Sequence, residues 1–239
     1  MRFCSASLTA TALVLLALIL AGCGSTFSPS ADNGIAAKSP TEILATAKAA
    51  AAAAASVHVA GSILSEGKPI SLDMELVGRN EGKGSVTLDG LKVRLIAVAG
   101  AVFVKGSTAF YARFAGAKVA RLLQGKWIEG SAAHGLLASF AALAGLEEVI
   151  DSALVDHGAL SSSGRARVHG KQVVGVSDAA RHGTLYVSST GEPYPVEILE
   201  SAAGTGTRAG TIVFDRWNEP VSLAAPRDSI SLSRLRSTG

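Results

Sequence analysis

The sequence predicts an α+β fold in which a single, strongly curved antiparallel β-sheet wraps around helices. Three observations predict it: a capped helix beginning at Ser39, two long stretches of alternating apolar residues after it, and a stretch of helical spacing between those two. Alternation with period 2 indicates strands, whereas apolar residues recurring every three or four positions indicate helices. Because helices and strands do not alternate one by one, a parallel sheet of βαβ units is not expected.

The first helix has a well-marked start. Ser39 can cap it, Pro40 suits the first helical position, and Glu42 can complete a capping box. An alanine-rich run over 43–55 continues the helix, and its small side chains allow close approach to a sheet. The alternative is a low-complexity linker, which the cap disfavours.

A meander of antiparallel hairpins follows the helix. Glycine-containing turns separate the apolar alternations, and Asp89-Gly90 is the strongest hairpin signal among them. The expected strands cover 57–63, 70–76, 86–88, 93–97 and 102–104.

The stretch 106–152 has helical spacing instead, interrupted by a short strand at 126–129. The expected helices cover 108–114, 118–124 and 136–150. Alternation then returns, with a turn at 161–164 and a last extended piece at 230–232. The expected strands of this second meander cover 154–160, 165–169, 172–176, 184–188, 196–201 and 211–217.

The N-terminus has the features of a lipoprotein signal. An apolar run over 8–20 ends in Leu20-Ala21-Gly22-Cys23, where small residues precede a cysteine that can be acylated. We expect a signal peptide over 1–22, a lipidated flexible tether over 23–38 that begins with a diacylglyceryl, palmitate-bearing Cys23, and a folded domain over 39–239. This places the protein on the extracytoplasmic face of the cell membrane. The alternatives are an ordinary secretory signal or an uncleaved anchor.

Composition excludes several function classes. The formal net charge is only +3, which does not favour nucleic-acid binding. The two cysteines are Cys4, in the signal peptide, and Cys23, so neither a disulfide nor a cysteine-based metal site is expected. The five histidines show no metal-ligand spacing, and no cofactor motif or catalytic constellation is present. The least implausible catalytic set is His134 with Glu147 and Glu148.

Apolar surface is the remaining candidate for function. A curved sheet with one helical insert either fills its concavity with its own side chains or leaves an apolar ligand cavity, and periodicity does not separate the two. For the cavity we take the more apolar face of each strand. The candidate lining residues are Ile63, Leu72, Met74, Leu76, Val93, Leu95, Val102, Val104, Phe110, Leu136, Phe140 and Leu143.

These features together resemble a known family, the mycobacterial LppX/LprA/LprF/LprG lipoproteins, whose fold is like that of the carriers LolA and LolB. The resemblance rests on the lipobox, the capped helix running into Ser56-Val57-His58, Val102-Phe103-Val104, Lys126-Trp127-Ile128, and the closing run 212–221 followed by Pro226. The resemblance covers most of residues 40–226, and its motifs are short patterns without a catalytic signature.

The resemblance implies a half-barrel with an apolar cavity between sheet and helices. It further implies a non-enzymatic function: binding an acylated lipid or glycolipid and helping to carry it through the cell envelope. The implied partners are that lipid, the membrane that holds the Cys23 anchor, and a membrane lipid exporter. The alternative is a surface-anchored interaction or sensor domain with a self-filled core.

Overall fold

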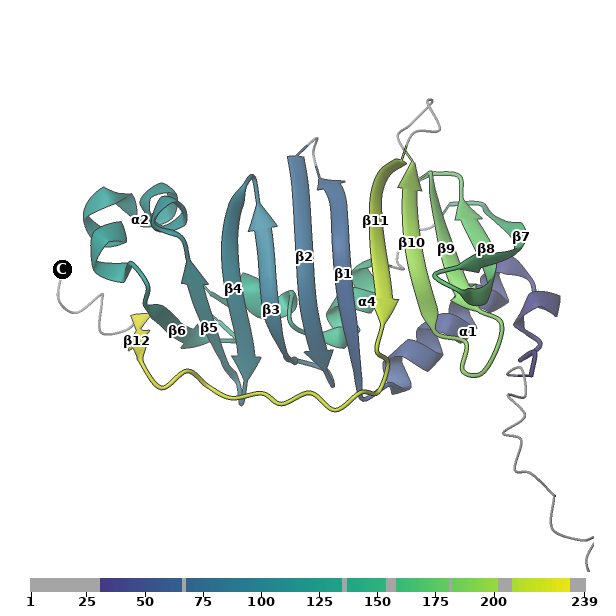
Figure 1. The fold of residues 1–239 in the computed structure, drawn as a ribbon, viewed down its shortest axis with the longest axis horizontal. Coiled ribbons are helices and arrows are strands. Elements are labelled where there is room, and N and C mark those ends of the chain that lie inside the picture. Colours follow the sequence, from purple (N-terminus) through teal and green to yellow (C-terminus); the bar gives the residue numbers. More distant parts are fainter. Residues whose placement is uncertain are drawn as a thin grey trace, which may run out of the picture. The chain divides into compact units, whose positions relative to one another are not determined.

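One open, curved β-sheet dominates the structure. The computed structural model describes residues 31–65, 68–134, 137–153, 158–180, 182–201 and 208–232. In that part, twelve strands follow the order β12-β6-β5-β4-β3-β2-β1-β11-β10-β9-β8-β7 (Figure 1). Their bounds are β1 Ser56–Ser65, β2 Lys68–Val77, β3 Glu81–Leu88, β4 Leu91–Val98, β5 Ala101–Gly106, β6 Trp127–Ser131, β7 Leu160–Val168, β8 Lys171–Asp178, β9 Gly183–Ser188, β10 Pro195–Ser201, β11 Arg208–Asp215 and β12 Ser229–Ser231.

The α+β class with one curved sheet is confirmed. All neighbouring strands pair antiparallel except β12, which pairs parallel with β6. That parallel pair was not expected, because it forms only after a long return of the chain from β11. The predicted hairpin at Asp89-Gly90 is present, and both residues have positive φ (51° and 77°), as a type I′ turn requires.

The predicted N-terminal helix cap is present in full. Helix α1, Pro40–Ala53, has Ser39 as its N-cap, and the Ser39 hydroxyl accepts a hydrogen bond from the Glu42 amide. The Glu42 carboxylate in turn accepts one from the Ser39 amide, at 2.9 Å. α1 packs against α4, β7, β8 and β10.

Between β5 and β6 lies helix α2, Thr108–Leu123. It is interrupted at Gly116, whose φ of 83° and ψ of 159° are not helical. The sequence expected two helices with a gap at this place, and the interruption agrees with that expectation. Tyr111 fixes α2 to the sheet, because its hydroxyl accepts a hydrogen bond from the Gly106 amide and donates to the Lys126 carbonyl.

Two predictions for the next segment were wrong. The single helix expected over 136–150 is two short helices, α3 Ala138–Ala142 and α4 Leu146–Ala153. They are separated at Gly145, where a Cβ would lie 2.4 Å from the Arg79 carbonyl oxygen. The strand expected over 154–160 is wrong at 158–159, since β7 begins only at Leu160; residues 154–157 lie outside the described part.

The turn expected at 161–164 is a bulge inside β7. The register with β8 shifts between Ser162 and Gly164, and Gly164 has a φ of 76°. A positive-φ glycine suits a bulge as well as a turn, and the sequence alone did not separate them.

The folded unit begins before the predicted boundary, at Asp32. Asn33 donates to the Ser188 and Gly191 carbonyls, and Ile35 in the 3₁₀ turn η1, Ile35–Ala37, is buried. Residues 32–38, which the sequence assigned to the tether, therefore pack on the sheet.

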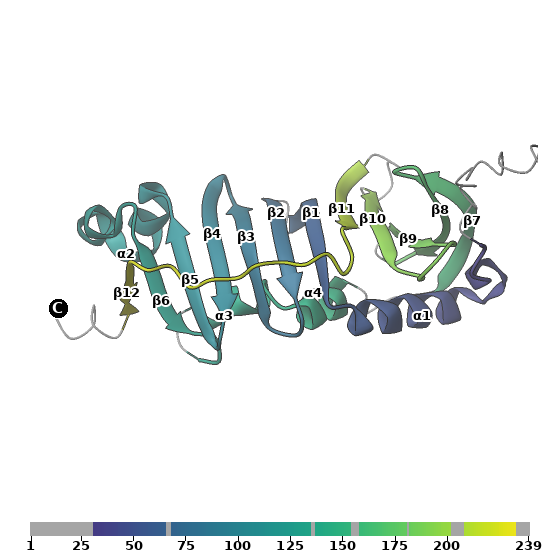
Figure 2. The same ribbon diagram turned by 60° about the horizontal axis from the view of Figure 1, so that its bottom comes forward.

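The two faces of the sheet differ. We call the face that carries Val57 and Val59 the inner face and the face that carries His58 the outer face. α3 and α4 lie over the inner face, since a Cβ at Gly82 would lie 2.7 Å from the Ala144 carbonyl oxygen. The segment 216–228, which we call the strap, runs from β11 to β12 across the strands (yellow in Figure 2). The strap lies on the outer side, because outward-facing Lys83 donates to the Ser222 carbonyl at 2.9 Å.

Within the described residues, no helix combines the length and the apolar character needed to span a membrane.

Candidate functional site

The predicted lining residues on strands share one sheet face. In the strand register, Met74 lies opposite Val59, Leu72 opposite Gly61, and Val104 opposite Leu95. Directly opposed residues point to the same side of a sheet. The inner face therefore carries all eight strand candidates: Ile63, Leu72, Met74, Leu76, Val93, Leu95, Val102 and Val104.

Most of these side chains are covered by the chain itself. Ile63 and Leu72 are half-buried, and the other six belong to the buried core: Met74, Leu76, Val93, Leu95, Val102 and Val104. The inner face is thus a continuous aliphatic surface under a roof of helices.

The helical candidates lie in that roof. Phe110 of α2 is buried and its ring meets that of Phe140 of α3 edge-on, with centroids 6.2 Å apart. Phe140 is half-buried, Leu143 is 37% exposed, and Leu136 lies outside the described residues. The structure therefore brings Phe110 and Phe140 together over the sheet and leaves Leu143 at the edge of the roof.

The roof is uneven. α4 buries Leu146 and Ile150, whereas α3 buries none of its residues. α3 is therefore the part of the roof held by the fewest buried contacts, and low local burial favours local opening.

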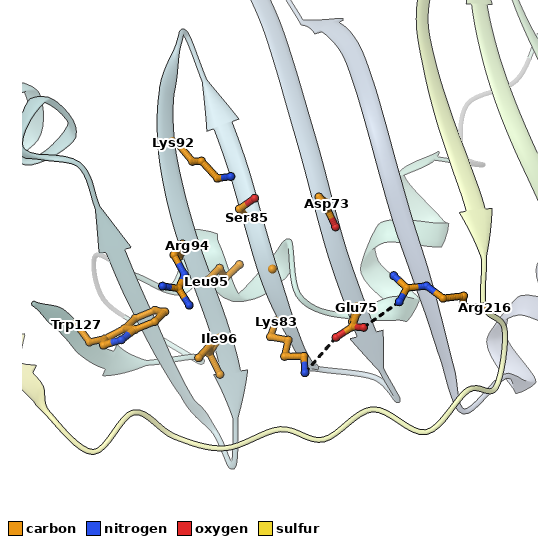
Figure 3. A pocket seen from close by; sticks show the side chains of 11 residues that line it. Asp73, Glu75, Lys83, Ser85, Lys92, Arg94, Leu95, Ile96, Trp127 and Arg216 are labelled. Carbon is orange, nitrogen blue, oxygen red and sulfur yellow. Dashed lines mark hydrogen bonds and ion pairs between the residues drawn. The ribbon is translucent and has the colours of Figure 1, made fainter. Parts of the chain in front are cut away.

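The outer face carries a second feature, an open pocket of about 350 Å³. Figure 3 shows the pocket floor on β2, β3 and β4, with the strap along one side. It is lined by Asp73, Glu75, Lys83, Gly84, Ser85, Lys92, Arg94, Leu95, Ile96, Trp127 and Arg216.

Charges in this pocket are unevenly distributed. At the β2 side, Glu75 forms ion pairs with Lys83 at 3.1 Å and Arg216 at 3.3 Å. At the β4 side, Lys92 and Arg94 have no carboxylate within ion-pair distance among the described residues. The Arg94 guanidinium lies 5.3 Å from the centre of the Trp127 ring, in cation–π geometry. Sequence reasoning missed this pocket because it looked for apolar lining.

Beside the pocket, His58 bridges two carboxylates. Its Nδ1 lies 2.6 Å from Asp215 and its Nε2 lies 3.0 Å from Asp73. Sequence reasoning did not predict that these three side chains meet. The only signal was the period-2 placement of these residues on their strands, which does not reveal that β1 pairs with both β2 and β11.

The catalytic set considered from the sequence is not assembled. His134 contacts the Ser131 hydroxyl at 3.4 Å, Glu147 pairs with Arg79 at 3.2 Å, and the Glu148 side chain lies outside the described part. Elsewhere His169 pairs with the buried Glu197 at 2.7 Å. Among the described residues, no group of three or more His, Cys, Asp or Glu side chains is placed to hold a metal ion.

Tyr111 is a buried residue of α2 whose hydroxyl has a structural role. Desolvation raises the pKa of its phenol, and the hydrogen bond from the Gly106 amide acts in the opposite direction. This hydroxyl is committed to the backbone of β5 and of the α2–β6 connection, so its role is to position α2.

Comparison with solved structures identifies a protein of similar fold. The chain is similar to LprF from Mycobacterium bovis, with a TM-score of 0.53 and 13% identity over 78% of this chain and 96% of LprF. An uncharacterised conserved protein from Thermus thermophilus aligns less well, with a TM-score of 0.41 and 9% identity over 80% of this chain and 98% of that one. MucB aligns with a TM-score of 0.36 and 18% identity over 79% of this chain and 63% of MucB.

No protein-family profile and no curated protein sequence matches the chain. At these identities the likeness to LprF concerns the fold alone. The resemblance indicated by the sequence is confirmed at that level: the protein has an LprF-like half-barrel with a helical roof.

Proposed function

We propose that the chain is a membrane-anchored envelope lipoprotein that binds an acylated lipid or glycolipid at its inner face and helps to carry it through the cell envelope. The observation that supports this most directly is the inner face itself. It is aliphatic from β1 to β5 and roofed by short helices, in a fold like that of LprF.

The physical basis is burial of acyl chains. Each buried CH₂ contributes about 0.8 kcal/mol, so a C16 chain gains on the order of 10 kcal/mol relative to water. A membrane shelters the chain about as well, so exchange between membrane and protein is close to balance, as a carrier requires. α3 buries none of its own residues and packs against β5, so its displacement would open the inner face there to an acyl chain.

The first test is a search for bound lipid. The full chain is purified from its membrane, and organic extracts are examined by mass spectrometry; a stoichiometric acyl lipid is the expected result. Transfer of a fluorescent acyl lipid between vesicles, with the lipid recovered unchanged, supports a carrier and not an enzyme.

A matched pair of variants locates the lipid. Leu72→Trp fills the inner face at a half-buried position, and Ser71→Trp places the same ring on the outer face one residue earlier. We expect Leu72→Trp to abolish lipid transfer and Ser71→Trp to leave it unchanged. Equal transfer by two folded variants would remove the inner face from the proposal.

The second prediction concerns the anchor. Cys23 is proposed to be acylated after removal of residues 1–22, and Cys23→Ser should release the protein from carbonate-washed membranes. Since the folded unit begins at Asp32, only residues 24–31 separate it from the anchor. Fully extended, this connection reaches about 30 Å. Retention of Cys23→Ser in the membrane fraction would contradict the lipobox interpretation.

One observation favours a second function, a surface-anchored interaction or sensor domain. Six of the eight strand candidates already belong to the buried core. This alternative would be favoured by an organic extract without lipid, together with lipid transfer between vesicles that is the same for Leu72→Trp and the wild type.

A further inference from the structure

We propose that the β4 side of the outer-face pocket is a binding site for a phosphate-type anion, with Arg94 of the pocket and Lys105, which lies opposite Arg94 on β5, as its main contacts. This site lies on the opposite side of the sheet from the acyl-binding surface proposed above, and it does not depend on that proposal. Its residues are Ser85, Lys92, Arg94 and Trp127 of the pocket lining, together with Lys105 beside the pocket on β5.

The central observation is a like-charged pair directly across two strands. Arg94 of β4 lies opposite Lys105 of β5 in the strand register. Like charges directly opposite one another destabilise a sheet. Among the described residues, neither side chain has a carboxylate within ion-pair distance, so the repulsion is not relieved by the chain's own acids. A bound anion would relieve it.

Trp127 holds both cations in place. The Arg94 guanidinium lies 5.3 Å from the ring centre and the Lys105 ammonium lies 6.0 Å from it. A guanidinium fixed in this way keeps its planar fork available for two parallel hydrogen bonds to a phosphate or carboxylate. The ring therefore orients a binding group that would otherwise be mobile.

Further donors lie on the same floor. Ser85 of β3 is opposite Arg94 on its other side, and Lys92 lies two residues before Arg94 on the same face of β4. Neighbouring strands are about 4.8 Å apart. Lys105, Arg94 and Ser85 thus form a row across three strands, and an anion of phosphate size can contact two or three of them at once.

The acidic residues of the pocket do not oppose this field. Glu75 is paired with Lys83 and Arg216, and Asp73 lies 3.0 Å from His58 Nε2. The two carboxylates of the pocket, Asp73 and Glu75, are thus matched in number by two cations, Lys83 and Arg216. The positive charge at the β4 and β5 side has no such match among the described residues.

The pocket volume indicates what accompanies the phosphate. About 350 Å³ is within the range of small-molecule sites and far larger than one anion. A phosphate ester fits this space, and it can come from a soluble metabolite or from the headgroup of an anionic lipid. The two sources share the same recognition chemistry, and the experiment distinguishes them.

The test follows the Trp127 indole N–H resonance. The sequence has two tryptophans, so Trp127→Phe assigns the signal. The full chain in nonionic detergent is titrated with glycerol 1-phosphate and, separately, with soluble dihexanoyl phosphatidylglycerol. Saturable shifts with both at similar affinity support a soluble phosphate ester; clearly tighter binding of the lipid supports a headgroup. No shift with either ligand would overturn the proposal.

Variants separate binding from packing. Arg94→Gln and Lys105→Gln should each weaken binding about tenfold, and Arg121→Gln, an exposed cation on α2, should leave it unchanged. Phosphate should raise the Tm of the wild type and not that of Arg94→Gln. A lowered Tm for ligand-free Arg94→Gln with unchanged phosphate affinity would make Arg94 a structural residue and contradict the proposal.

Discussion

The two faces of the β2–β5 region differ in the kind of side chain they carry and in what covers those side chains. The inner face has aliphatic residues and glycines, and the chain's own helices cover it. The outer face alternates with it residue by residue and carries lysine, arginine and carboxylate side chains beneath a single strap. The inner-face side chains are buried, whereas only part of the charged outer-face side chains form ion pairs.

This difference separates stability from recognition. Inner-face residues exclude water and make the sheet stable, so substitutions there act mainly on folding. Outer-face residues keep their charges in solvent, where ion pairs contribute little to stability but define an electrostatic field. Adjacent residues on one strand can therefore be substituted to test the two roles separately.

The largest difference is expected at Leu95 and Ile96. Leu95→Ala removes a fully buried inner-face side chain and should lower the free energy of unfolding by about 2–5 kcal/mol. Ile96→Ala, on the outer face, should cost less than half as much, because Ile96 is only half-buried. Urea denaturation with a check of equal m-values measures both. Equal losses would mean that the strap buries the outer face as effectively as the helices bury the inner one.

Much of the fold follows from local signals in the sequence. The Ser39 cap, the Asp89-Gly90 turn and the alternation of β2 to β5 each depend on residues close together in the chain, and each is present. The break between α3 and α4 does not follow from local signals. Gly145 lies there against the Arg79 carbonyl, which is distant in sequence. The parallel pairing of β12 with β6 also joins segments that are distant in sequence, so local signals do not predict it.

The candidate sites divide in the same way. Alternation placed the eight strand candidates on one face, and the register confirms that they share it. The outer pocket was missed because it requires knowing that Arg94 is opposite Lys105 and that Arg216 returns beside Glu75. Charged residues on a half-exposed strand look like ordinary solvated positions until the pairing of strands is known.

An intermediate effect is expected at the helix cap, which belongs to the inner roof through α1. Ser39→Ala should cost about 0.5–2 kcal/mol at neutral pH. The hydrogen bonds from the Ser39 hydroxyl and amide lower the pKa of Glu42 below its ordinary value. A lowered folded-state pKa adds stability above the unfolded value, and that stability is lost as the pH falls through the folded value.

The difference between wild type and Ser39→Ala should therefore shrink in acid. Urea midpoints at neutral pH and at pH values below the Glu42 pKa measure it. Glu42→Gln is the control, since it removes the titrating group and should leave a Ser39→Ala effect that no longer varies in this range. A pH-independent Ser39→Ala effect in the wild-type background would contradict the coupling.

The smallest stability effect is expected on the outer face, at Glu75. Its ion pairs with Lys83 and Arg216 join side chains that are 29%, 38% and 44% exposed. Glu75→Gln should lower the free energy of unfolding by at most about 1 kcal/mol, and less at high salt, because exposed ion pairs are screened. The same change leaves Lys83 and Arg216 without their carboxylate and makes the pocket more positive. It should therefore strengthen glycerol 1-phosphate binding while slightly weakening the fold, a combination that no inner-face substitution should give. A loss near the roughly 3–5 kcal/mol typical of breaking a buried pair, or unchanged phosphate affinity, would show that the two faces are not separated in this way.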